Sequence, residues 1–251
     1  MPISAGEHGF IVNGLSEDCR CDGRGSLDLR HLSIRTGSIP FCNGSCAVRR
    51  VNTSDFVLAG VKLEVITVDS PAFNVSVECF DRRNCRDLVE QVEQQLKSMV
   101  NSPGVVDDKY VWGISVDIIV MGSDGNLSDL ISLAVYSALQ DTKVPNTQMI
   151  ETEDGMDFEL THGETCLTSL ESIPIRITLY SIQGSIAADV DEQEEQCADA
   201  SLSVLVNRQG SLCRTDIHGG LMPLSTLAHN LASCTQIALE LFKLIDKELL
   251  F

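Results

Sequence analysis

The spacing of the apolar residues changes along the chain, and this change constrains the fold more than any other feature. Alternating or β-branched runs separated by turn-forming residues predict strands over residues 28–36, 45–51, 56–66 and 73–80. The apolar residues then move to helical spacing, with Leu88, Val92 and Leu96 on one face. This pattern predicts a helix over residues 86–100, and the dense apolar run that follows predicts a strand over residues 111–120.

A similar order of strands and helix recurs further along the chain. A second helix is expected over residues 127–139, and the acidic residues after it are expected to form a strand and loop region. Two further strand pairs are predicted, residues 173–182 with 185–190 and residues 201–206 with 211–215. A long helix should begin near Pro223, because Leu227, Leu231 and Leu241 keep helical spacing. A core-facing helix is favoured here over a coiled-coil seam.

These elements predict an α+β protein made of two similar strand and helix lobes in one compact module, because sheets with a helical layer bury their apolar faces this way. The lobes are expected at residues 28–147 and 172–250, and no strong linker separates them. A chain of 251 residues buries about 70% of its extended surface, so its core needs no disulfide or metal. The absence of a long apolar run and of a basic leader predicts an intracellular, soluble protein without a membrane segment.

The chain is strongly acidic, and the excess is uneven. It has 36 Asp and Glu residues against 18 Lys and Arg residues, and a formal net charge of −18. Within residues 151–200, Arg176 is the only Lys or Arg. Because polyanions need cationic surfaces, such a chain is a poor binder of nucleic acid by itself, and any role with RNA must rest on another face or on partner subunits.

The ten cysteines give no metal or disulfide pattern. There is one Cys-x-Cys, formed by Cys19 and Cys21, and no Cys-x-x-Cys with a suitably spaced histidine. Free thiols are therefore expected. The sequence also lacks the Gly-x-Ser-x-Gly, Walker and His-Glu-x-x-His motifs, and no cofactor is expected.

Four blocks of sequence, in order, resemble the RNase PH family. The first contains Asp22, Gly23 and Arg24, with Arg30 following it, and matches the family's opening Arg-x-Asp-Gly-Arg signature. The remaining blocks are residues 43–62, 116–139 and 189–206. The resemblance is greatest to members that form the ring of the eukaryotic RNA exosome. It implies an RNase PH fold within a hexameric ring. For the opening signature itself, structural salt bridges and a turn are favoured over RNA contact.

Active members of the family bind phosphate at the start of the helix after a Gly-rich turn, where their motif is Gly-Gly-Thr-Arg. The matching residues here are Asp124, Gly125, Asn126 and Leu127, a degenerate phosphate site. The arginine has become leucine, which removes a charge-assisted hydrogen bond of about 1.5–3 kcal/mol. Asn126 is expected to cap the helix, and Asp129 is expected to occupy the free amides of its first turn.

The resemblance also locates the residues that would contact RNA. Active relatives carry arginines along the first long helix, where this chain has Glu90 and Gln94. The basic cluster Arg82, Arg83 and Arg86 precedes that helix, in a region that relatives turn toward the pore. It is a candidate RNA contact, with an exposed solubilising loop as an equal alternative.

The last block carries the acidic residues that active members use for a metal ion. Those members place two aspartates six residues apart on a strand, and this chain has Asp189 and Glu195 there. Carboxylates at that spacing could hold Mg²⁺ weakly, as a vestigial site, and a solvated acidic edge is the favoured alternative.

The sequence therefore predicts a non-catalytic ring subunit that supports 3′–5′ processing and degradation of RNA. The alternative is an active phosphate-dependent exoribonuclease that uses Asp189 and Glu195 with Mg²⁺. The resemblance implies other RNase PH-like ring subunits, exosome cap proteins and RNA in the assembled ring as partners. It implies a location in the nucleus, nucleolus and cytoplasm.

Overall fold

A computed structural model describes residues 3–80, 85–97, 105–107, 110–152, 155–167 and 170–249. Within these ranges the chain forms five α-helices, one short 3-10 helix and twelve strands. In order they are α1 (Ala5–Ser16), β1 (Leu32–Thr36), β2 (Gly44–Arg50), β3 (Phe56–Thr67), β4 (Phe73–Cys79), α2 (Arg86–Lys97), β5 (Val105–Asp107), β6 (Tyr110–Gly122), α3 (Leu127–Asp141), β7 (Lys143–Thr152), β8 (Gly155–Cys166), η1 (Leu170–Ser172), β9 (Ile175–Ile182), β10 (Ser185–Ala188), α4 (Glu192–Cys197), β11 (Ala200–Val206), β12 (Leu212–Gly219) and α5 (Leu224–Leu249).

The first sheet has the order β1-β2-β3-β6-β4, and β5 pairs with the first residues of β6. All pairs are antiparallel except β4 with β6, which run parallel and are joined through α2. Helix α3 packs across β1, β2 and β3, and α2 packs on β4 and α3. Side chains from Leu130 to Leu139 are all buried because α3 is enclosed on every side.

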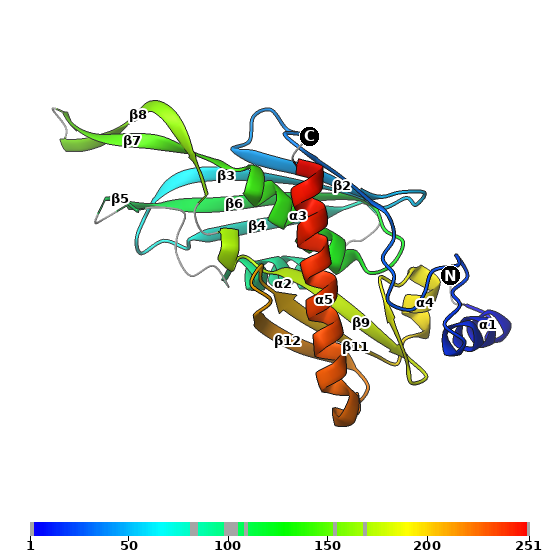
Figure 1. Ribbon diagram of the computed structural model, residues 1–251. Helices are drawn as coiled ribbons and strands as arrows, with labels where there is room; N and C mark the ends of the chain where they lie inside the picture. Colours follow the sequence, from blue (N-terminus) through cyan, green and yellow to red (C-terminus); the bar gives the residue numbers. More distant parts are fainter. Residues whose placement is uncertain are drawn as a thin grey trace.

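The second sheet has the order β10-β9-β11-β12, and every residue of β9 is buried. Strand β9 contacts both α3 and the long helix α5, and in the view of Figure 1 α5 passes in front of the second sheet. Gln183 and Gly184 turn β9 into β10 with φ angles of 46° and 91°, the left-handed backbone that a two-residue hairpin requires. One continuous core joins both sheets, with Tyr136 and Leu179 among its fully buried side chains.

Most predicted elements are confirmed, and the α+β class with them. The acidic residues after α3 are the long β7–β8 hairpin, which projects beyond the first sheet (Figure 1). Helix α1, with its capping box formed by Ser4 and Glu7, is not among the predicted elements. The lobe bounds 28–147 and 172–250 remain a prediction, although the two sheets fall within them.

The resemblance placed Asp189 and Glu195 on an acidic strand, and this placement is wrong. Asp189 has a φ of 45°, which ends the extended backbone of β10, and residues Glu192–Cys197 form the short helix α4. Asp191 caps that helix by accepting hydrogen bonds from the amides of Gln193 and Glu194. Because a helix replaces the strand, Asp189 and Glu195 do not lie on one strand face as the family pattern implied.

All ten cysteines have free thiols in the structure. Among the described residues, no helix is both long enough and apolar enough to cross a membrane.

Candidate functional site at the start of helix α3

The candidate site is the turn between the end of β6 and the start of α3. Gly125 and Asn126 both have left-handed backbone, with φ angles of 78° and 44°. A Cβ atom on Gly125 would lie 2.3 Å from the carbonyl carbon of Asp191, so only glycine lets the turn approach the segment before α4 this closely. The Asp124–Leu127 region is therefore held against the residues that follow β10.

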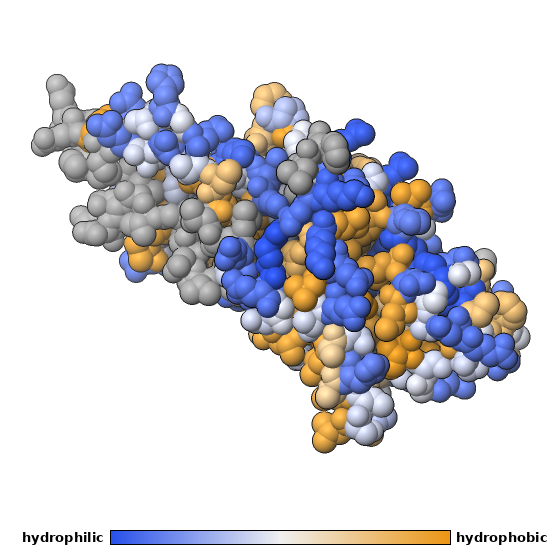
Figure 2. Space-filling model, in the orientation of Figure 1, coloured by the Kyte–Doolittle hydropathy of each residue, from blue (hydrophilic) through white to orange (hydrophobic). Residues whose placement is uncertain are grey.

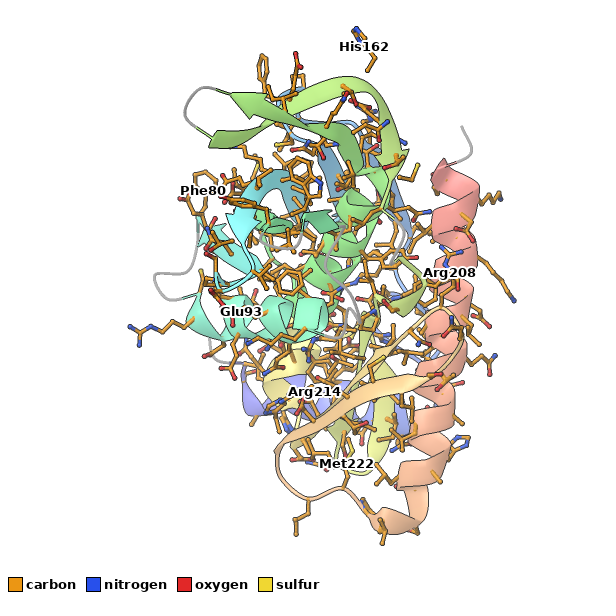
Figure 3. The ribbon with its side chains drawn as sticks, turned by 90° about the vertical axis from the view of Figure 1, so that its left-hand side faces the viewer. Phe80, Glu93, His162, Arg208, Arg214 and Met222 are labelled. Carbon is orange, nitrogen blue, oxygen red and sulfur yellow. The ribbon has the colours of Figure 1, made fainter. Side chains whose placement is uncertain are left out.

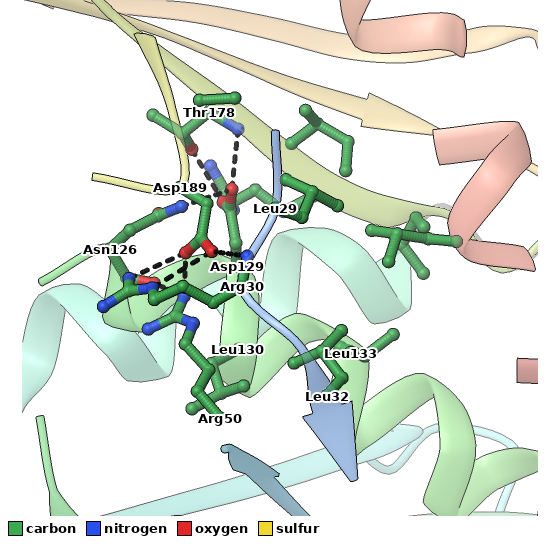
Figure 4. A pocket seen from close by; sticks show the side chains of 15 residues that line it. Leu29, Arg30, Leu32, Arg50, Asn126, Asp129, Leu130, Leu133, Thr178 and Asp189 are labelled. Atoms are coloured by element: carbon green, nitrogen blue, oxygen red, sulfur yellow. Dashed lines mark hydrogen bonds and ion pairs between the residues drawn. The ribbon is translucent and has the colours of Figure 1, made fainter. Parts of the chain in front are cut away.

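Two buried arginines hold the carbonyl groups of this turn. Arg30 Nη1 donates to the carbonyl of Asp124 at 2.7 Å. Arg50 donates to the carbonyls of Gly125 and Asn126, each at 2.9 Å. Figure 4 shows both guanidinium groups side by side below Asp189. Arg50 belongs to β2 and Arg30 to the segment before β1, so these hydrogen bonds fix the turn to both.

Asp189 joins the two arginines. Its Oδ1 accepts from Arg30 Nη2 at 2.7 Å and lies 2.9 Å from Arg50 Nη2, while its Oδ2 accepts from the backbone amide of Arg30 at 2.7 Å. Burial alone would raise the pKa of Asp189, but the Arg30 hydrogen bonds and the charges of Arg50 and Arg30 outweigh it and hold the pKa at about 2. Asp189 is therefore ionised and ion-paired in the folded protein.

The opening signature forms structural salt bridges. Arg20 pairs with Glu194 through two hydrogen bonds, and both side chains are almost fully buried. Gly23 closes a turn by donating to the carbonyl of Arg20, and Arg24 pairs with Asp22 at 2.6 Å. These contacts agree with the structural interpretation of the signature.

The amide groups of the turn are held by carboxylates. The amide of Asp124 donates to Asp55, and the amide of Asn126 donates to Glu195 Oε2 at 3.2 Å. Tyr180 holds the other oxygen of Glu195 at 3.3 Å. The Glu195 carboxylate of α4 thus lies at the N-terminal end of α3, where a helix favours an anion.

The predicted capping of α3 is wrong in its details. Asn126 is the N-cap residue, but its side chain makes no capping hydrogen bond. Asp129 turns inward, where Thr178 of β9 donates its amide at 2.8 Å and its hydroxyl at 2.7 Å. Asn126 Nδ2 also donates to Asp129, at 2.9 Å. Burial raises the pKa of Asp129 despite the opposing hydrogen bonds.

A cavity of about 330 Å³ opens in front of the turn. Its lining includes Gly125, Leu127 and the carboxylates of Glu192 and Glu195, and among the described residues no Lys or Arg lines it. The degenerate phosphate site therefore faces a hollow that carries negative charge. Leu127, which replaces the family's arginine, is 4% exposed and belongs to the core.

The two predicted metal ligands do not fit a divalent cation. Both oxygens of Asp189 already contact guanidinium groups, and Glu195 binds a backbone amide and a tyrosine hydroxyl. A cation beside Asp189 would lie close to two positive charges. Across the described ranges, no three His, Cys, Asp or Glu side chains are arranged to hold a metal ion.

The predicted RNA contacts remain a prediction. Arg82 and Arg83 lie outside the described residues, and Arg86 is the exposed first residue of α2. Glu90 and Gln94, at the positions of the relatives' arginines, are hydrogen-bonded to each other at 3.2 Å. This pair gives α2 no positive charge for a phosphate backbone.

The network around Asp189 is the part of the site that sequence reasoning missed. The contacts of Arg50 with Asp55 and of Arg30 with Asp189 join residues from four separate segments. Their only sequence signal is that arginines and aspartates stand beside apolar strand residues, where a charge must be paired once it is buried.

Comparison with known proteins agrees with this fold. Residues 28–145 match the model of the 3′ exoribonuclease family, domain 1, known as RNase PH. The exosome complex exonuclease RRP42 of Dictyostelium discoideum is 28% identical over 98% of this chain and 98% of its own length. The exosome complex component Rrp42 of Pyrococcus furiosus is 27% identical over 94% of this chain and 91% of its own length.

Solved structures give the same architecture. An archaeal exosome core chain matches with a TM-score of 0.78 and 24% identity, covering 96% of both chains. A chain of the Archaeoglobus fulgidus exosome with RNA bound to the active site matches with a TM-score of 0.76 and 21% identity, covering 94% of this chain and 96% of that one. Residues 28–145 thus match domain 1 of the RNase PH family, and the fold of the chain matches that of chains from solved exosome cores.

Proposed function

We propose that this chain is a ring subunit of an RNA exosome and does not itself carry out phosphorolysis. Its similarity to exosome components extends over almost the whole length of both proteins, in a eukaryote and in an archaeon. Its fold matches chains of assembled exosome cores. Its partners are then other RNase PH-like ring subunits and cap proteins, and RNA passes through the assembled ring.

The observation that carries the non-catalytic part is the position of Glu195. Its carboxylate accepts the amide hydrogen of Asn126 at 3.2 Å, at the end of α3 where active relatives bind phosphate. An incoming phosphate must displace this carboxylate or lie beside it. Two like charges 4 Å apart repel by about 4 kcal/mol at an effective dielectric constant of 20, and this repulsion opposes phosphate binding.

Among the residues that the structure describes, no cation in the cavity lining offsets this repulsion. Leu127 occupies the place of the family's arginine, and the described lining of the cavity has no Lys or Arg. Arg30 and Arg50 lie behind the turn and are fully engaged with Asp189 and with the turn carbonyls. A charged phosphate in the cavity would therefore find, in the described part of the chain, no free guanidinium group of the kind that phosphate recognition commonly uses.

A subunit of this kind contributes binding surfaces for other subunits and for RNA, and no catalytic residues. Its net charge of −18 favours association with more basic ring and cap subunits. Its expected RNA contacts are Arg82, Arg83 and Arg86, and its expected locations are the nucleus, nucleolus and cytoplasm.

Two measurements test this proposal. Co-expression with the other RNase PH-like subunits of the same organism, followed by native mass spectrometry, should give a closed ring that contains this chain. The purified chain, incubated with RNA, phosphate and Mg²⁺, should release no nucleoside diphosphates. Phosphate-dependent shortening of the RNA by the chain alone would establish the active exoribonuclease instead.

A gain-of-binding variant tests the role of Glu195 directly. Glu195→Gln combined with Leu127→Arg removes the carboxylate and restores the family's cation, so calorimetry should detect saturable binding of millimolar phosphate that the wild-type chain lacks. Glu192→Gln with Leu127→Arg is the matched control, because Glu192 lines the same cavity but binds no amide of the turn. Tight phosphate binding by the wild-type chain would contradict the proposal.

A further inference from the structure

A second, larger cavity lies on another side of the molecule. It has a volume of about 600 Å³ and is enclosed by the loop of residues 18–28, the β9–β10 hairpin and the first turns of α5. This volume is typical of sites that enclose a ligand or a peptide side chain. None of its walls belongs to the turn before α3.

A buried donor in this cavity has no partner. Asn230 of α5 lines the cavity and is 3% exposed, and its Nδ2 has no hydrogen-bond acceptor among the described residues. An unpaired buried amide is unfavourable, so a rotation of the Asn230 side chain toward a carbonyl or hydroxyl oxygen of a ligand in the cavity would be favoured.

The mouth of the cavity is acidic. Asp18 and Asp28 line it, and among the residues that the structure describes no Lys or Arg does. Asp18 uses Oδ1 to hold Ser26, and Asp28 uses Oδ2 to hold the amide of Gly25. The second oxygen of each carboxylate has no hydrogen bond in the described part of the chain, and both side chains are exposed. The electrostatic complement of this mouth is a lysine or arginine side chain.

Apolar surface continues outward from the cavity. Leu27 and Met222 line it, and Leu221 and Leu224, which flank the lining residues Met222 and Pro223, are 98% and 83% exposed. Figure 3 places Met222 just before the first turn of α5, and Figure 2 shows hydrophobic surface along this end of α5. Contiguous apolar surface beyond a pocket indicates a macromolecular partner.

We infer that this cavity docks an extended segment of a partner protein, in which an apolar residue fills the cavity beside a lysine or arginine. A backbone carbonyl of the segment accepts from Asn230 Nδ2, and the basic side chain pairs with Asp18 and Asp28. The inference rests on the proposed function, because the ring and cap subunits are the proteins that would supply the segment.

The test uses the full chain and defined peptides. Fluorescein-labelled, overlapping fifteen-residue peptides that cover the other RNase PH-like and cap subunits of the same organism are titrated by fluorescence anisotropy. One contiguous group, with Lys or Arg beside an apolar residue, should bind. Thr226→Arg, which places a cation in the cavity wall, should weaken that binding at least tenfold. Ser225→Arg should change it less than twofold, because Ser225 lies on the same exposed turn but outside the cavity.

Each other outcome overturns the inference. If no peptide binds, or if Thr226→Arg and Ser225→Arg weaken binding equally, the cavity is not the docking site. If spermine binds in a manner sensitive to Thr226→Arg and no peptide does, the cavity takes a free polycation. Native mass spectrometry of the ring is measured separately, so a ring that assembles without peptide binding contradicts only this inference.

Discussion

The starts of helices α3 and α4 lie close together, since the Asn126 amide at the start of α3 donates to Glu195 of α4. Their first turns are nevertheless stabilised in different ways. At α4, Asp191 Oδ1 accepts hydrogen bonds from the backbone amides of Gln193 and Glu194, and Glu194 Oε2 accepts one from the backbone amide of Asp191. All these contacts span at most three residues. At α3, the Asn126 side chain makes no capping bond, and the acceptor for its amide is Glu195, 69 residues away.

This difference shows which residues stabilise the first turn of each helix. The first turn of α4 contains the side chains that accept its free backbone amides, so its stability is local. The α3 start depends on Arg30 and Arg50, which hold the turn carbonyls, and on Asp189, which holds both arginines. The same dependence brings a carboxylate to the point where active relatives bind phosphate. The unfolding free energies of variants can therefore distinguish the locally stabilised first turn of α4 from the first turn of α3, which the tertiary structure stabilises.

The largest effect is expected from Asp189→Asn. The change removes the carboxylate that Arg30 and Arg50 share and leaves Asp55 as their main countercharge. Breaking a buried ion pair in this way costs about 3–5 kcal/mol of unfolding free energy. Urea denaturation followed by circular dichroism measures this loss. Asp191→Asn is the matched control, because asparagine caps a helix about as well as aspartate, and it should cost less than about 0.5 kcal/mol.

If Asp189→Asn lies within about 1 kcal/mol of the wild type, the α3 turn does not depend on this ion pair, and the contrast between the two helices fails.

The second effect is a pH dependence with a defined sign. The pKa of Asp189 is about 2, below its usual value of 3.8, because its contacts with Arg30 and Arg50 outweigh burial. The stabilisation is therefore fully present above pH 4 and is lost as the pH falls from about 4 to 2, by about 2 kcal/mol in total. Asp129 acts in the opposite direction, because burial raises its pKa and protonation favours its folded state.

Comparing two proteins isolates the Asp189 part of this dependence. The difference in unfolding free energy between the wild type and Asp189→Asn should shrink by about 2 kcal/mol between pH 5 and pH 2. A difference that stays constant over that range would show that Asp189 is not ion-paired in the folded chain.

The contrast between α3 and α4 also explains how far the sequence could be interpreted. Apolar spacing predicts α3, α5 and most strands, because each pattern lies within one short segment. The Asp-x-x-Glu capping box at Asp191 is equally local, but it was not predicted because the family resemblance placed these residues on a strand. The positions of Asp129 and Glu195 could not be predicted, since their partners Thr178 and Asn126 lie 49 and 69 residues away. Replacement of the family's phosphate-site arginine by Leu127 was visible directly.

The smallest effect on the unfolding free energy is expected from Asp191→Ala, at the N-cap of α4. The change removes the acceptor for the amides of Gln193 and Glu194, and loss of an N-cap costs about 1 kcal/mol. Glu194 keeps its pairing with the buried Arg20, so the packing of α4 on the opening segment should persist. Glu192→Ala, in the same first turn but without a capping bond, should cost less than about 0.5 kcal/mol. A loss from Asp191→Ala as large as that from Asp189→Asn would mean that α4 also depends on the tertiary structure, because a purely local cap cannot contribute several kcal/mol.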